Sequence, residues 1–358
     1  MSSYGLMQVH DGENAKVDVV FLHGLRGDRE KTWTEEGVLW PKDLLPQDIP
    51  ESRIFLFGYD TGITHRDQSS VTRTEIHSDA EDLCARLAAE RWSTRTEDRP
   101  IIFIAHSLGG LVAAQILVHG EQETENSRTK SITKNLRGMI FLGTPFRGSS
   151  AAKPAEIARR ILDFFGIDTQ QHTLKLLGVD SERLDELTRA FPNVLNKRRT
   201  SKDPKDRIEA FFFYETLKTG WGKGSIQIVE VDSAQLPGCG DATPIHADHV
   251  RICKFKTAKD EGYSVVIAAI RKAMLPPDAA FQQVRKNPLR LVSSTRTTKS
   301  CITLLTLFLF PKAGHQDHQY TWESCECCRH HVYYESNRQN VTTGTFQRWK
   351  HSMLSGRA

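Results

Sequence analysis

Six apolar runs constrain the fold of this chain more than any other feature of its sequence. They lie at residues 16–24, 53–60, 100–107, 136–145, 207–216 and 225–234. Each run is apolar along most of its length, which is typical of strands buried on both faces of a parallel sheet. Helical spacing of apolar residues between the second and third runs, and again over residues 260–275, predicts helices that cover the sheet. We therefore expect an α/β fold with a mostly parallel sheet flanked by helices.

The third run ends in a turn that places a serine between small residues. Ala105 and Gly109 lie two residues before and after Ser107, and the apolar stretch 111–117 follows directly. This pattern matches the nucleophile elbow, a strained strand-to-helix turn that exposes a reactive hydroxyl. A serine here can also be an ordinary helix N-cap. The strand before it and the helix after it favour the nucleophile, because open parallel sheets bind ligands at the carboxyl ends of their strands.

A nucleophilic serine requires a histidine base and an acid that orients the base. In a fold of this type the acid and the histidine follow the serine in chain order, each after a later strand. Glu215 meets this condition at the end of the fifth run, and Asp60 and Asp232 are the alternatives. His246 and His249 both follow the sixth run, which we expect to be the last strand. Spacing alone does not choose between the two histidines.

Such a serine also requires N–H donors for the oxyanion that forms when it attacks a carbonyl. One donor is expected from the residue after the nucleophile, Leu108, and the second from the loop after the first strand. That loop reads FLHGLRGD, and we expect Leu25 to supply the second N–H. His23 lies at the strand end within the turn, so we expect it to have a structural role.

Charge and cysteine usage exclude several other classes of protein. The net charge is +4, and residues after Leu275 hold 11 Lys and Arg against 5 Asp and Glu, so the basic excess belongs to the tail. No aromatic residues interleave with these basic residues, so no nucleic-acid partner is expected. Seven scattered cysteines, the lack of a secretory signal and the lack of an apolar stretch of about 20 residues favour a cytoplasmic location.

The tail over residues 276–358 lacks sustained periodicity, and we expect it to be irregular and poorly ordered. It contains an H-x-x-H pair (His315, His318) and a C-x-x-C pair (Cys325, Cys328) separated by six residues. Zinc fingers separate their ligand pairs by about 12 residues or more. We therefore expect no metal site, and no cofactor is implied elsewhere in the chain.

Seven motifs together resemble the serine esterase family of α/β-hydrolases. They read VDVVFLHGLRGDREKTWT, WPKDLLP, RIFLFGYD, IIFIAHSLGGLVAAQIL, GMIFLGTPFRGS, FFFYET and ADHVRICKF, and they span about residues 4–275. This lipase-like family includes the serine-active-site-containing proteins and the hydrolase domains of fungal NACHT/NB-ARC receptor-like proteins. The resemblance implies a hydrolase domain over residues 1–275 with a triad of Ser107, Glu215 and His249, which favours His249 over His246. It also implies a small-molecule or lipid ester as substrate and a role in lipid metabolism.

Further expectations follow, and the chain differs from the family pattern at two points. Residues 150–206 are more than a simple connection between strands needs, and helical spacing of their apolar residues predicts a helical cap whose Phe164 and Phe165 would receive an acyl chain; the alternative is that these helices only pack on the sheet. The resemblance implies peripheral association with mitochondrial or endoplasmic reticulum membranes as an alternative location. Phe146 stands where the family has His, at a strand end, and is expected among the substrate contacts. The chain contains no G-x-x-x-x-G-K-[ST], so no nucleotide-binding domain is expected in it. A non-catalytic sensor or scaffold that keeps the hydrolase fold is the alternative function.

Overall fold

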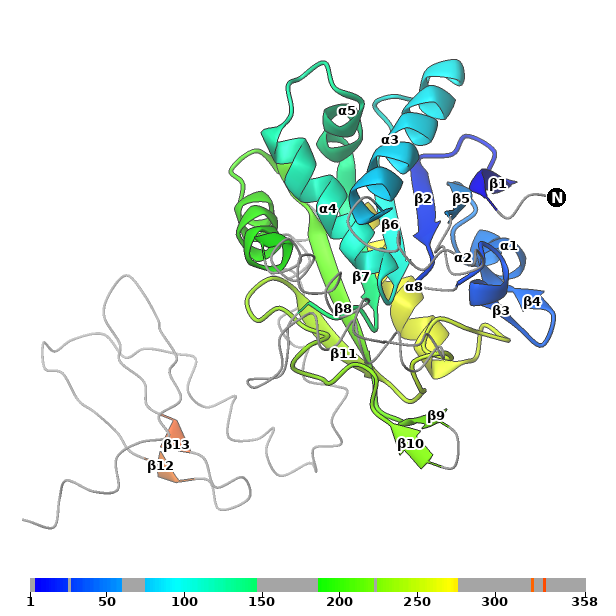
Figure 1. Cartoon of the computed structure of the whole chain (residues 1–358), viewed down its shortest axis with the longest axis vertical. Helices are drawn as coiled ribbons and strands as arrows, with labels where there is room; N and C mark the ends of the chain where they lie inside the picture. The colour runs from blue at the N-terminus through cyan, green and yellow to red at the C-terminus, as the bar shows by residue number, and fades with distance from the viewer. Residues whose placement is uncertain are drawn as a thin grey trace, which may run out of the picture. The chain divides into compact units, whose positions relative to one another are not determined.

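One seven-stranded sheet has the strand order β1-β5-β2-β6-β7-β8-β11 in the computed structural model (Figure 1). Its strands are β1 (Gly5–Asp11), β2 (Val17–Leu22), β5 (Ser52–Gly58), β6 (Ile101–His106), β7 (Leu136–Leu142), β8 (Glu209–Glu215) and β11 (Asp241–Ile245). The edge strand β1 pairs antiparallel with β5, and the other pairs are parallel. The expectation of a mostly parallel sheet is thereby confirmed.

The structure describes residues 4–24, 27–59, 75–146, 186–221 and 224–275, together with residues 323–324 and 331–332. The chain divides into two units, Met1–Asn287 and Pro288–Ala358. In the second unit, β12 (Glu323–Ser324) pairs antiparallel with β13 (His331–Val332). Among the described residues, no helix is both long enough and apolar enough to cross a membrane.

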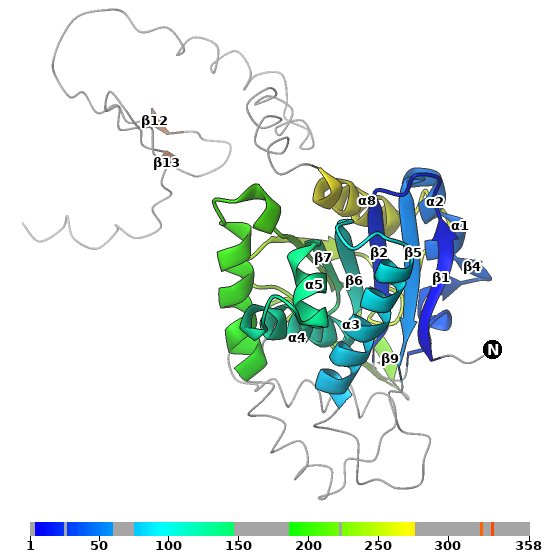
Figure 2. The same cartoon turned by 90° about the horizontal axis from the view of Figure 1, so that it is seen from above.

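Helices cover both faces of the sheet (Figure 2). The first face is covered by α3 (Glu75–Ser93), α4 (Gly109–Gln122), α5 (Arg128–Lys134) and a helix over residues 186–199. The second face is covered by α1 (Trp40–Asp43), α2 (Leu45–Asp48) and α8 (Glu261–Met274). The smaller elements are the 3-10 turns η1 (Lys31–Trp33) and η2 (Pro204–Asp206) and the hairpins β3 (Thr34–Glu35) with β4 (Val38–Leu39) and β9 (Thr219–Trp221) with β10 (Gly224–Ile226).

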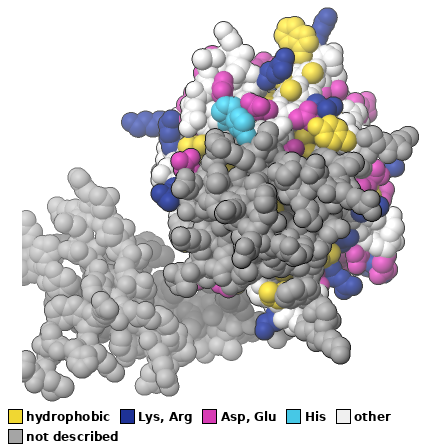
Figure 3. Space-filling model, in the orientation of Figure 1, with side chains coloured by type: hydrophobic (Ala, Val, Ile, Leu, Met, Phe, Trp, Pro, Cys, Tyr) yellow, Lys and Arg dark blue, Asp and Glu magenta, His cyan; other side chains and the backbone are white. Residues whose placement is uncertain are grey.

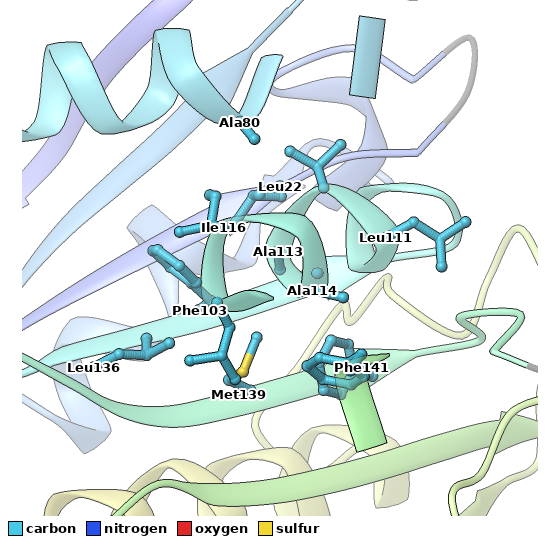
Figure 4. Packing of buried hydrophobic residues seen from close by; sticks show 14 of the residues in the cluster. Leu22, Ala80, Phe103, Leu111, Ala113, Ala114, Ile116, Leu136, Met139 and Phe141 are labelled. Atoms are coloured by element: carbon cyan, nitrogen blue, oxygen red, sulfur yellow. The ribbon is translucent and has the colours of Figure 1, made fainter. Parts of the chain in front are cut away.

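The pleat of the buried strands divides the apolar core into two clusters. In β2, Val20 and Leu22 pack with α3 and α4, whereas Val19 and Phe21 pack with α1 and α8. Every residue of β2 and β6 is buried. Figure 4 shows the first cluster, in which Leu22, Phe103, Met139 and Phe141 from the strands meet α4. Burial on both faces explains why these runs are continuously apolar rather than alternating.

A buried charge cluster lies at the start of β2. The Asp18 carboxylate is fully buried and accepts hydrogen bonds from Arg53, Arg91 and Arg99. Arg91 also donates to the carbonyls of Glu97 and Arg99 at the end of the loop before β6. A buried charge is tolerated only when it is paired and hydrogen-bonded, and the partners of Asp18 connect β2 with β5 and α3.

Three strand assignments differ from the sequence expectation. The run over residues 225–234 is not the last strand of the sheet, because its start pairs with β9 as β10 and the rest forms turns. The last strand is β11, which pairs with β8 and was not expected. The edge strand β1 was also not expected, since its half-buried residues give no continuous apolar run.

The described part of the expected cap, residues 186–206, packs on the body of the protein. Its helix buries Leu187, Phe191 and Leu195 in the same cluster as α4 and the first face of the sheet. The other residues of the expected cap, with Phe164 and Phe165, lie outside the described residues.

Candidate active site

Ser107 lies in a strained turn between β6 and α4. Its backbone has φ +52°, in the left-handed region that non-glycine residues rarely adopt. The Ser107 N–H donates to the Leu142 carbonyl at 2.9 Å, which ties the turn to the end of β7. Strain of this kind costs about 1–3 kcal/mol and persists where the surrounding structure enforces it. The turn therefore has the geometry of a nucleophile elbow.

Close approach of neighbouring backbones explains the small residues around the turn. A Cβ at Gly109 would lie 2.3 Å from the His23 carbonyl oxygen, and one at Gly24 would lie 2.8 Å from the Ser107 Cβ. Ala105 is fully buried within β6 and lies opposite Leu22 and Phe141 in the neighbouring strands. The methyl group at position 105 thus fits the core, while positions 24 and 109 have no room for one.

Ser107, His249 and Glu215 form a continuous chain of hydrogen bonds. The Ser107 Oγ lies 2.9 Å from His249 Nε2, and His249 Nδ1 lies 3.0 Å from Glu215 Oε2. All three side chains are buried. A carboxylate only accepts hydrogen bonds, so Nδ1–H donates to Glu215 and Nε2 is left to accept the serine proton. This arrangement is suited to general-base activation of a serine.

The segment after β10 holds the Glu215 carboxylate from its other side. Its Oε1 accepts the Val229 N–H at 2.9 Å, so each carboxylate oxygen has its own donor. Gln227 Nε2 donates to the carbonyls of Glu215 and Val229. Ile228, Val229 and Ala234 of the same segment form a small buried cluster. The turn that replaces the expected sixth strand thus positions the acid.

Two polar contacts and one glycine position His249. Its N–H donates to Thr219 Oγ1 at 3.1 Å, and its carbonyl lies 2.8 Å from His106 Nε2. Gly143, with φ +60°, lies so close that a Cβ there would be 3.1 Å from Glu215 Oε2 and 3.2 Å from His249 Nδ1. These contacts leave the imidazole little freedom to turn away from Ser107.

Burial keeps two further histidines neutral near the site. It lowers the pKa of His106 to about 3, with the nearby His249 as a second cause, so the neutral ring donates Nε2–H to the His249 carbonyl. Burial also lowers the pKa of His23. His23 Nδ1 lies 2.8 Å from the Gly24 carbonyl, its Nε2 accepts the Tyr59 N–H, and its ring stacks on Tyr59. Both His23 nitrogens are engaged, as expected for a structural residue.

Not every residue expected at the site lies beside Ser107. His246 is exposed, and its Nδ1 lies 3.2 Å from Thr216 Oγ1. Asp232 is exposed in the turn after β10. Asp60 lies outside the described residues, as do Leu25, Phe164 and Phe165.

The expectation that Phe146 contacts substrate is not supported by its position. The side chain is 1% exposed and stacks on Phe191, with edge contacts to Phe141 and Phe212. Phe146 thus packs in the core, because the chain turns inward after β7 and its N–H donates to the Ser233 carbonyl.

The expected oxyanion donor Leu108 occupies the N-cap of α4. N–H groups at a helix N-terminus lack partners within the helix, and the helix dipole favours negative charge there. Among the described residues, the one group of side chains spaced to bind a metal lies on α3 and α4 and includes no member of the hydrogen-bonded chain from Ser107 to Glu215.

Comparison with known proteins agrees with this architecture. A model of the alpha/beta hydrolase family matches residues 19–320. Protein SERAC1 of Homo sapiens is 30% identical over 286 residues, which cover 75% of this chain and 40% of the relative. Protein SERAC1 of Mus musculus is 31% identical over 269 residues, which cover 70% and 38%. The chain thus spans about two fifths of the length of these curated relatives.

Among solved structures, two similar ones are an esterase of Pyrococcus furiosus and a variant of monoglyceride lipase from Saccharomyces cerevisiae. The first is 16% identical with a TM-score of 0.41, covering 72% of this chain and 82% of the other. The second is 13% identical with a TM-score of 0.41, covering 75% and 89%.

Proposed function

The chain belongs to the alpha/beta hydrolase family, and from that premise we propose that it is a serine hydrolase of carboxylic esters, with lipid-like esters as substrates. Ser107 is the proposed nucleophile, His249 the base and Glu215 the acid. The observation that carries the proposal is the pair of hydrogen bonds of 2.9 and 3.0 Å that joins these three buried side chains.

In the first half of the proposed reaction, His249 Nε2 takes the proton of Ser107 as Oγ bonds to the ester carbonyl carbon. The negative charge moves to the carbonyl oxygen, where the Leu108 N–H stabilises it, together with a proposed second N–H from Leu25. Glu215 holds the imidazolium that forms. The tetrahedral intermediate then breaks its bond to the alkoxy group, which leaves as an alcohol with the proton from His249.

In the second half, water replaces the alcohol. His249 takes a proton from the water as its oxygen bonds to the acyl carbon, and the bond to Ser107 Oγ then breaks. The proton returns to Oγ and the carboxylic acid leaves. The neutral His106 and the Thr219 hydroxyl support both halves, because they position the His249 backbone without competing for the transferred proton.

A fluorophosphonate probe tests the proposal directly, because it forms a covalent bond with an activated serine. We expect it to label the full chain at Ser107, identified by mass spectrometry of the modified peptide, and to abolish hydrolysis of p-nitrophenyl esters. Ser107→Ala should prevent labelling and lower kcat/KM on the order of 10⁶-fold. Retention of the fold in this variant is checked by circular dichroism.

The alternative is a sensor or scaffold domain without catalysis. It predicts a folded protein that neither reacts with the probe nor hydrolyses any ester in a series of increasing chain length. That outcome in a correctly folded wild-type protein would reject the proposed activity.

A further inference from the structure

Two His–Glu pairs face each other where α3 crosses α4. His77 and Glu81 lie one turn apart on α3, with Nε2 and Oε1 separated by 3.4 Å. His119 in the last turn of α4 and Glu123 at its C-cap form the second pair, with Nε2 and Oε1 at 2.8 Å. The two imidazole rings lie 4.9 Å apart. Figure 3 shows histidine side chains beside acidic ones on the face that carries α3 and α4.

Among the residues that the structure describes, no cation from Lys or Arg pairs with the carboxylates of this cluster. Within the described part of the chain, the ion-pair partners of Glu81 and Glu123 are these two histidines. The nearby Arg86 is paired with Asp82 instead, and Lys130 with Glu125. With neutral imidazoles the four side chains carry a formal charge of about −2. A bound divalent cation would balance that charge.

The spacing of the ligand atoms fits a metal ion with small side-chain movements. One ligand atom each from His77, Glu81 and His119 lies within 4.8 Å of the others. Tetrahedral zinc bonds of about 2.0–2.2 Å bring its ligands to about 3.4 Å from one another. His77 and Glu81 are 43% and 56% exposed, so their side chains are free to make that adjustment, whereas His119 is 19% exposed and more firmly held.

We propose that His77, Glu81 and His119 form a binding site for a divalent transition metal of the zinc class, which joins the start of α3 to the end of α4. Glu123 holds the His119 ring through its hydrogen bond, as carboxylates do for metal-bound histidines. Two imidazoles and one carboxylate suit Zn²⁺, Co²⁺ or Ni²⁺, whereas Mg²⁺ and Ca²⁺ prefer oxygen ligands alone. The site lies at the opposite end of α4 from Ser107 and is separate from the proposed hydrolase site.

The sequence contains a signal that only the fold makes meaningful. The pattern H-x-x-x-E occurs three times, at residues 77–81, 119–123 and 331–335. The first two occurrences lie on α3 and at the end of α4, where this spacing brings the two side chains to the same side of the helix. The distance in sequence between the two patterns does not predict that α3 and α4 bring them together. The sequence expectation of no metal site therefore rested on the Cys and His pairs of the tail alone.

The test is calorimetric titration of the full chain with Zn²⁺, compared with Ca²⁺ and Mg²⁺. Because the tail contains cysteines, all titrations use the background variant Cys325→Ser/Cys328→Ser. We expect about one equivalent of Zn²⁺ to bind with micromolar or tighter affinity, and Ca²⁺ and Mg²⁺ not to bind. Saturating Zn²⁺ should also raise the Tm of this protein, because the metal binds only where α3 and α4 are folded together.

Single substitutions distinguish the proposed metal ligands from nearby residues that do not bind the metal. Loss of an outer hydrogen-bond partner costs about 10–100-fold in metal affinity, so Glu123→Gln should weaken Zn²⁺ by that factor and His119→Ala or His77→Gln by more. The matched control is Asp82→Asn, which removes a carboxylate from the same helix and should leave the affinity unchanged. The proposal is overturned if the background variant binds Zn²⁺ no tighter than about 100 μM, or if His77→Gln and His119→Ala bind it as the background does.

Discussion

At the scale of single residues, Glu215 divides its two oxygens between His249 and Val229. In Glu215→Gln the amide oxygen can keep only one of these donors. If it accepts the Val229 N–H, the amide NH₂ faces His249 Nδ1 and favours the tautomer with the proton on Nε2. That tautomer cannot take the serine proton, so we expect kcat to fall by about 10⁴-fold, as in other triads that lose their acid in this way. Ester hydrolysis under saturating substrate measures the effect.

His246→Ala is the matched control for this prediction. His246 belongs to the same loop as His249 but is exposed and contacts Thr216. We expect its substitution to change kcat less than about tenfold, while His249→Ala should cost on the order of 10⁶-fold. If His246→Ala were the more damaging variant, the assignment of the base would be wrong.

Candidates for the serine, the acid and the histidine could be predicted from the sequence. The residues that position these side chains could not. Ser107 and Glu215 end apolar runs that are parallel strands, and the carboxyl ends of such strands meet at one edge. The two histidines were expected after the sixth run, which is not a strand of the sheet, and they follow β11, which has no apolar run. Thr219, Gln227 and Gly143 act through hydrogen bonds or close approach to residues distant in sequence. No local pattern marks such contacts, because they exist only once the sheet has assembled.

At the scale of elements, α4 lies so close to the end of β7 that Gly110 has no room for a side chain. A Cβ there would lie 2.1 Å from Thr144 Oγ1, and Thr144 is fully buried. Gly110→Ala gains about 1 kcal/mol of helix propensity, but overpacking costs about 1–3 kcal/mol. Because the buried threonine cannot move aside, we expect the overpacking cost to exceed the gain and the free energy of unfolding to fall by up to about 2 kcal/mol. Urea denaturation measures the change.

Two further variants isolate the steric cause. Thr144→Ala removes the nearest atoms, so the double variant should lose less stability than the sum of the single substitutions. Gly220→Ala adds the same methyl group in β9, where no atom lies within 4 Å, and should be close to neutral. Additive losses in the Gly110 and Thr144 variants would show that the contact does not cause the destabilisation.

The elements that sequence patterns missed are those with incomplete burial. β11 is short, carries Pro244 and has exposed residues along most of its length, so it has no apolar run. β1 is an antiparallel edge strand with mostly half-buried residues. Conversely, the apolar run at 225–234 buries Ile228 and Val229 in a small cluster with Ala234 rather than in the hydrogen-bonded ladder of the sheet. A continuous apolar run therefore indicates that a segment is buried. A buried segment is a strand only where it pairs with neighbouring strands.

At the scale of the whole molecule, α8 completes the second face of the sheet. Its side chains Tyr263, Val266, Ile267 and Ile270 are buried against strands and against Trp40 of α1. Tyr263 also donates its hydroxyl to Asp48 of α2. Each large apolar side chain contributes about 1.5–3 kcal/mol when fully buried. The helix thus contributes about as much as the 5–15 kcal/mol by which domains are typically stable.

The stabilisation by α8 predicts where the chain can be shortened without loss of the fold. A protein that ends at Asn287, the boundary between the two units, keeps α8 and should unfold at the same Tm as the full chain, with unchanged reactivity of Ser107 toward a fluorophosphonate. A protein that ends at Asp260 lacks α8 and exposes the second cluster, so it should be unfolded or aggregated. Thermal unfolding of both proteins by circular dichroism distinguishes these outcomes. A loss of more than about 5 °C in Tm on ending at Asn287, equivalent to about 1–2 kcal/mol in a domain of this size, would show that residues 288–358 stabilise the first unit.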